Sequence, residues 1–227
     1  MAGILIENGG LLPEILKILH AEDWDCNWLL TGLEVVDWEN GRDWEEPVFL
    51  SNRELLRDAE RMQFIWGILS AIPVSYTREQ VLSFRLPAFS EDENGESCYL
   101  ADRLRPQHPL AFLEIMAEDS SSVTVIADDM EPLRSLFQLR EWTEDAERSN
   151  RRWHEVVERG QALLTAHGLS RWEYRTCPGI SQKIRNDRIA LIWRNLYWHQ
   201  PDRPICEDDI HMELLGMLET ERKDSYG

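Results

Sequence analysis

The chain has 227 residues, 43% of them hydrophobic, and its 24 Lys and Arg against 42 Asp and Glu give a formal net charge of −18. That hydrophobic content is enough to build a core, so a wholly disordered chain is not expected. Residues 1–139 hold 10 basic and 26 acidic side chains, whereas residues 140–227 hold 14 and 16. A negative field repels phosphate and anionic lipid, so we expect no direct nucleic-acid binding and no membrane binding. A basic protein is the partner that such a surface attracts.

The cysteines and the first residues indicate a cytoplasmic protein. Cys26, Cys98, Cys177 and Cys206 lie far apart and form no CxxC pair, so neither a zinc site nor a redox motif is expected. The opening MAGILIENGG has a short apolar run and no basic leader, which is unlike a signal peptide or a membrane anchor. The chain contains neither GxxxxGK nor GxGxxG, so we expect no nucleotide and no other cofactor.

The first expected elements are a strand, a helix and a further strand region. GILIE at 3–7 is β-prone and precedes an Asn-Gly-Gly turn. LLPEILKILH at 11–20 places its Leu and Ile side chains at helical spacing. Residues 24–36 alternate loosely between apolar and polar, which predicts one or two strands.

The segment 34–46 reads EVVDWENGRDWEE, so it places two tryptophans among six carboxylates with one arginine. Its Asn40-Gly41 pair predicts a type I′ hairpin, because both central residues of that turn need a positive φ. Such a turn sets Trp38 opposite Asp43 and Asp37 opposite Trp44.

Two interpretations of this hairpin remain open. In the first, a tryptophan packs back on the core beside an ordinary acidic surface. In the second, the rings and carboxylates form a recognition edge for a cationic partner. The candidate partner-binding residues are Glu34, Asp37, Trp38, Glu39, Asp43, Trp44, Glu45 and Glu46.

The middle of the chain predicts an α+β fold with a mixed or antiparallel sheet. Ser51 and Glu54 form a capping box that opens a helix over 52–62, and residues 63–72 read as a buried central strand. Residues 111–119 and 123–129 read as two strands joined tightly, followed by a helix over 130–139. Consecutive strands with irregularly spaced helices are typical of α+β rather than of βαβ units.

Beyond residue 141 the pattern changes to helices. Apolar spacing predicts a helix from Thr143 to about Gly168, a helix over 183–199 and a last helix over 207–219. We therefore expect an acidic α+β domain at 1–139 and a mainly helical segment at 140–227. Whether the two pack as one unit stays open at this point.

The first part resembles an uncharacterised bacterial family of small α+β proteins, a domain of unknown function. The matching stretches are GILIEN, LLPEILKIL, WDCNWLL, FIWGILSAIP and PLAFLEIMAEDSSSVTVIADDMEPLRSLF, which lie within residues 1–139. The resemblance implies a fold and no reaction, and no functional residue is carried over from it.

The alternative to a binding module is a metal-dependent or other enzyme that uses the helical segment. His154 and Glu158 lie four residues apart, which places them on one helix face at a spacing that could hold a metal. The sequence supplies no third ligand, and a solvated charged face explains the pair equally well. We therefore predict a non-catalytic module that binds a basic protein, in the manner of an immunity protein that inhibits a toxin or nuclease.

Overall fold

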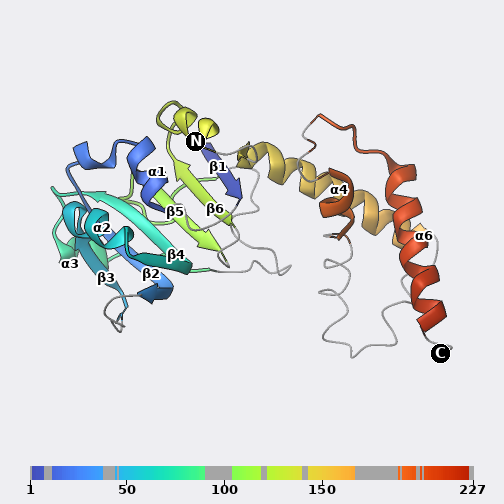
Figure 1. The fold of residues 1–227 in the computed structure, drawn as a ribbon, viewed down its shortest axis with the longest axis horizontal. Coiled ribbons are helices and arrows are strands. Elements are labelled where there is room, and N and C mark those ends of the chain that lie inside the picture. Colours follow the sequence, from blue (N-terminus) through green and yellow to red (C-terminus); the bar gives the residue numbers. More distant parts are fainter. Residues whose placement is uncertain are drawn as a thin grey trace. The chain divides into compact units, whose positions relative to one another are not determined.

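The computed structural model describes residues 2–7, 12–37, 44, 46–89, 104–118, 122–139, 143–166, 189, 191–197, 200 and 202–224. The chain divides into two compact units, Met1–Arg148 and Ser149–Gly227. We call them the sheet unit and the carboxy-terminal unit, and both are drawn in Figure 1.

The sheet unit is built on one seven-stranded sheet in the order β3-β2-β4-β5-β6-β1-β7. Every pair of neighbouring strands is antiparallel, so the predicted α+β class is confirmed. The strands are β1 (Ala2–Glu7), β2 (Cys26–Asp37), β3 (Val48–Ser51), β4 (Met62–Pro73), β5 (Leu113–Glu118), β6 (Ser122–Ala127) and β7 (Thr143–Asp145).

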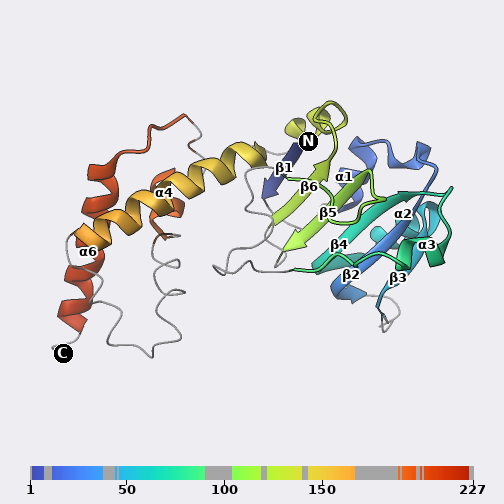
Figure 2. The same cartoon turned by 180° about the vertical axis from the view of Figure 1, so that it is seen from behind.

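Helices cover one face of this sheet and form the main core with it. They are α1 (Leu12–Ile18), the short 3₁₀ helix η1 (Ala21–Asp23), α2 (Asn52–Ala59) and the longer 3₁₀ helix η3 (Glu131–Gln138). Ile15 of α1, Leu55 of α2 and Leu133 of η3 are fully buried in one cluster with side chains from the strands. Helices α1 and α2 lie in front of the sheet in Figure 1 and behind it in Figure 2.

The opposite face carries the short helix α3 (Arg78–Leu82) and the segments around it. Two smaller buried clusters lie on this face, one around Ile68 and Met116 and the other around Leu29 and Val81. Because strand side chains alternate between faces, the buried residues of β4 and β5 serve both layers. This second layer contains the candidate site described below.

The expected helix over 143–168 begins three residues later than predicted, because residues 143–145 form β7 instead. This edge strand pairs with β1, with Leu5 opposite Glu144. Asp145 Oδ1 then accepts a hydrogen bond of 2.8 Å from the Arg148 N–H, which caps α4 (Ala146–Ala166). The sheet unit therefore extends to Arg148, past the predicted boundary at residue 139.

The carboxy-terminal unit contains most of α4, a π-helical turn η5 (Trp193–Tyr197) and α6 (Glu207–Asp224). Val156, Ile192 and Ile210 are fully buried in its separate core. Arg152 donates to the carbonyls of Gln200 and Arg203 and so ties the segment before α6 to α4. No helix in the described ranges combines the length and the hydropathy that a membrane crossing requires.

Candidate functional site

The site begins with an irregularity in β2, which we call the β2 bulge and define as residues 31–35. The pairing of β2 with β4 shifts register between Thr31 and Glu34 and again between Glu34 and Val35. Gly32 has a φ of +60°, a conformation that glycine adopts without steric cost. A Cβ at this position would also stand only 3.0 Å from Cδ2 of Phe89. Both the backbone angle and the nearby ring therefore favour glycine at this position.

The Glu46 carboxylate binds the bulge from the β3 side. Its Oε2 accepts a hydrogen bond of 2.8 Å from the Gly32 N–H, and its Oε1 accepts another from the Leu33 N–H. These donors have no strand partner at the bulge, so the carboxylate satisfies them. Glu46 is nevertheless exposed. Within the described residues, no ion pair joins its carboxylate to a cationic side chain.

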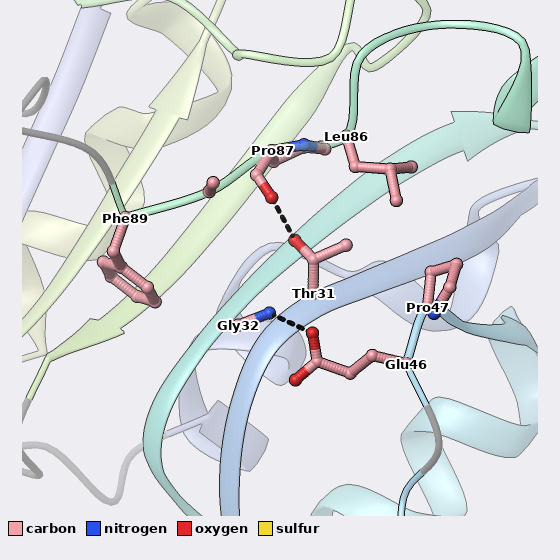
Figure 3. A pocket seen from close by; sticks show the side chains of 8 residues that line it. Thr31, Gly32, Glu46, Pro47, Leu86, Pro87 and Phe89 are labelled. Carbon is pink, nitrogen blue, oxygen red and sulfur yellow. Dashed lines mark hydrogen bonds between the residues drawn. The ribbon is translucent and has the colours of Figure 1, made fainter.

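An open pocket of about 390 Å³ lies over the bulge, and we call it the bulge pocket. Its lining residues are Thr31, Gly32, Glu46, Pro47, Leu86, Pro87, Ala88 and Phe89. Figure 3 shows Glu46 and Phe89 on opposite sides of Gly32, with Pro87 above Thr31. The pocket therefore combines one carboxylate, one aromatic ring and several apolar side chains.

Hydrogen bonds and ring packing hold the pocket walls in place. Thr31 Oγ1 donates to the Pro87 carbonyl over 2.8 Å, which fixes the 86–89 segment to β2. The ring of Phe89 meets Trp66 edge to face, with centroids 5.3 Å apart. Ala88 N–H donates to Gln107 Oε1 over 3.0 Å. The 86–89 segment is thus fixed by β2, β4 and residue 107.

A buried carboxylate anchors Gln107 in turn. Glu114 is fully buried, and its Oε2 accepts a hydrogen bond of 2.9 Å from the Ser70 hydroxyl. The Gln107 N–H lies 3.2 Å from both Glu114 oxygens. Burial raises the pKa of Glu114 to about 7, and the hydrogen bonds from Gln107, Ser70 and the His108 backbone oppose that rise.

His108 is buried beside this carboxylate as a neutral imidazole. Its Nδ1 accepts a hydrogen bond from the Leu110 N–H, so the ring proton is on Nε2, which donates to the Val81 carbonyl over 3.2 Å. Burial lowers the pKa of His108, and the bond to Val81 opposes that change. His108 and Glu114 together hold residues 104–112 against the sheet and α3.

The structure describes four of the eight predicted partner-binding residues, namely Glu34, Asp37, Trp44 and Glu46. Trp38, Glu39, Asp43 and Glu45, with the expected Asn40-Gly41 turn, lie outside the described residues, and Asp37 is described only as the last residue of β2.

Glu34 is exposed and belongs to the β2 bulge, to which Glu46 also binds. Trp44 is half-buried and packs against the main core. The first interpretation of the hairpin, a tryptophan that packs inward, therefore applies to Trp44.

The two candidate metal ligands, His154 and Glu158, lie on α4 without a further ligand in the described part of the chain. His154 is half-buried, Glu158 is exposed, and the neighbouring Glu155 forms an ion pair with Arg159. Within the same described ranges, no three His, Cys, Asp or Glu side chains gather closely enough to hold a metal ion.

Comparison with protein-family models, with curated proteins and with solved structures found no match. The resemblance of residues 1–139 to an uncharacterised bacterial family therefore stays a prediction.

Proposed function

We propose that this protein is a non-catalytic module that binds a basic protein through the acidic surface of its sheet unit. The observation that carries the proposal is how the charge divides between the two units. Met1–Arg148 contains 12 basic and 30 acidic residues, a net charge of −18, whereas Ser149–Gly227 contains 12 of each and is neutral. The whole formal charge of the chain thus belongs to the sheet unit.

A field of this kind acts before any contact forms. Complementary charge steers a cationic protein toward the acidic surface and raises the association rate, by about 10-fold to 1,000-fold in strongly steered pairs. The same field repels nucleic acid and anionic membranes. An immunity-type inhibitor of a basic toxin or nuclease fits this description, because it competes with an anionic substrate by presenting its own carboxylates. The proposal places this binding in the cytoplasm.

Reversing four charges in the predicted hairpin tests the proposal. We expect a tagged wild-type chain to capture a basic protein from the extract of its own cells at low salt and to release it at high salt. The variant with Asp37, Glu39, Asp43 and Glu45 all replaced by Lys is expected to lose that protein. The measurement is quantitative pull-down followed by binding of the purified partner.

A second charge-reversed variant separates a local surface from bulk charge. Its four substitutions to Lys are at exposed acids of other elements, namely Glu22, Glu60, Glu79 and Asp128. We expect this variant to retain more of the partner than the hairpin variant. Undiminished binding by the hairpin variant, or a partner that is not basic, would contradict the proposal.

A further inference from the structure

The Glu46 carboxylate is positioned more firmly than an ordinary surface acid. Two backbone N–H groups of the β2 bulge donate to it, one to each oxygen. An ionised carboxylate has roughly four acceptor sites, so each oxygen retains capacity for another donor. The carboxylate is also exposed in the lining of the bulge pocket. It is therefore a fixed negative charge that an incoming cation can reach.

The other walls of the bulge pocket suit the remaining parts of a long basic side chain. Phe89 offers an aromatic ring, and a cation near a ring face is attracted by its quadrupole. Leu86 and the two prolines, Pro47 and Pro87, supply apolar surface of the kind that covers the methylene stem of lysine or arginine. The Thr31 hydroxyl donates its hydrogen bond to the Pro87 carbonyl. The Glu46 carboxylate is therefore the main polar group that the pocket offers to a ligand.

We infer that the bulge pocket receives a lysine or arginine side chain of a basic partner, with Glu46 as its counter-charge and Phe89 as its aromatic wall. This inference rests on the proposed function and names the chemical group that the partner presents. The pocket volume of about 390 Å³ falls within the range of about 300 to 1,000 Å³ typical of ligand sites. The net charge of the sheet unit attracts the partner, and the pocket selects one of its side chains.

Titration of the full chain with N-acetyl-arginine amide, followed by NMR of the backbone amides, tests this inference. The Gly32 and Leu33 resonances report directly on Glu46, because both N–H groups donate to its carboxylate. We expect saturable shifts at these two amides with the arginine probe and none with the neutral N-acetyl-citrulline amide. We expect Glu46→Gln to lower the affinity of the chain for the arginine probe by about fivefold, and Phe89→Leu to lower it by about two- to fivefold.

Matched variants remove the same groups elsewhere in the sheet unit. Glu60→Gln removes an exposed carboxylate from the end of α2, and Phe84→Leu removes an exposed ring outside the pocket lining. Neither is expected to change probe affinity. Equal affinity in wild type and Glu46→Gln, or an equal loss in Glu60→Gln, would overturn the inference. If the NMR spectrum shows that Glu46→Gln does not fold, Phe89→Leu is the variant that tests the inference. An affinity of Phe89→Leu for the probe equal to that of the wild type would then overturn it.

The outcomes also distinguish this inference from the proposed function. If the arginine probe does not bind but a basic protein does, the pocket inference fails and the proposed function stands. If the probe binds at Gly32 and Leu33 but no basic protein is captured, the proposed function fails, and with it the assignment of the pocket to a basic protein partner, whereas the chemistry assigned to Glu46 and Phe89 stands.

Discussion

Replacing Asn52 with alanine is expected to lower the free energy of unfolding of the sheet unit by on the order of 4 kcal/mol. Asn52 is the first residue of α2 and is buried. Its Oδ1 accepts a hydrogen bond of 2.9 Å from Nε1 of the fully buried Trp28. Its Nδ2 donates to the carbonyls of Ala21 over 2.6 Å and of Trp24 over 3.0 Å. One side chain thus joins α2, β2 and η1.

The effect is large because the substitution removes three hydrogen bonds and leaves the buried Nε1–H of Trp28 without its partner. A buried donor without a partner costs about 1 to 3 kcal/mol, and each of the two lost bonds to a carbonyl costs about 0.5 to 1.5 kcal/mol. The Ala21 carbonyl keeps a second hydrogen bond, from the Trp24 N–H. A typical domain is stable by only about 5 to 15 kcal/mol in total. The loss would therefore remove a large part of the stability of the sheet unit.

Denaturant unfolding of the full chain, followed by tryptophan fluorescence, measures this effect. Arg53→Ala is the matched control, because Arg53 is the next residue of α2 and is exposed, and we expect it to change the stability by less than about 0.5 kcal/mol. A loss below about 1 kcal/mol for Asn52→Ala would show that the buried network does not hold these elements together.

The second large effect concerns pH and the buried Glu114. Burial raises the pKa of its carboxyl from 4.5 to about 7. Between these two values the folded state keeps a proton that the unfolded state has released. The contribution of Glu114 to stability is therefore fully present below about pH 4.5 and is lost as the pH rises through about 7. The loss amounts to about 3 kcal/mol, because each tenfold difference in proton affinity between the two states corresponds to about 1.4 kcal/mol.

Comparison with Glu114→Gln isolates this contribution, because both chains share every other titrating group. We expect the unfolding free energy of the wild type, relative to that of the variant, to fall by about 3 kcal/mol between pH 4.5 and pH 8. Denaturant titrations at several pH values give the difference directly. A constant difference across this range would show that Glu114 does not titrate with a raised pKa.

Much of the fold follows from local signals in the sequence. The capping box predicted at Ser51 and Glu54 is present in the structure. The expected pair of strands around Ser120–Ser122 forms the β5–β6 hairpin. These predictions succeed because capping and short hairpins depend on residues that are close in the sequence.

β7 shows where local signals are insufficient. Residues 143–145 read as the start of a helix, because Thr143 precedes a long helical pattern. They form a strand because β1 presents a free edge to them, with Ile4 opposite Asp145. The pairing of β7 with β1 joins residues that are far apart in the sequence. A segment of three residues is also too short to show the alternation of apolar and polar residues that predicts a strand.

The bulge pocket could not have been predicted from the sequence alone. In the sequence Glu46 is only one of several acids, although in the structure its carboxylate binds the backbone of Gly32 and Leu33. Phe89 is distant from Gly32 in the sequence, although its ring lies 3.0 Å from the position that a Cβ of residue 32 would occupy. The one signal in the sequence is Gly32 itself, because a glycine inside a strand pattern often marks a bulge.

The most direct test of electrostatic steering is the association rate of the full chain with its captured basic partner, measured across ionic strength. At about 0.5 M salt the Debye length is shorter than the roughly 10 Å found at 0.1 M, so steering by the sheet unit is largely screened. We expect the rate to fall by about tenfold or more from low to high salt, and the hairpin variant to show a much weaker dependence. An association rate that is independent of salt, in the wild type and in the variant alike, would contradict steering by the acidic surface.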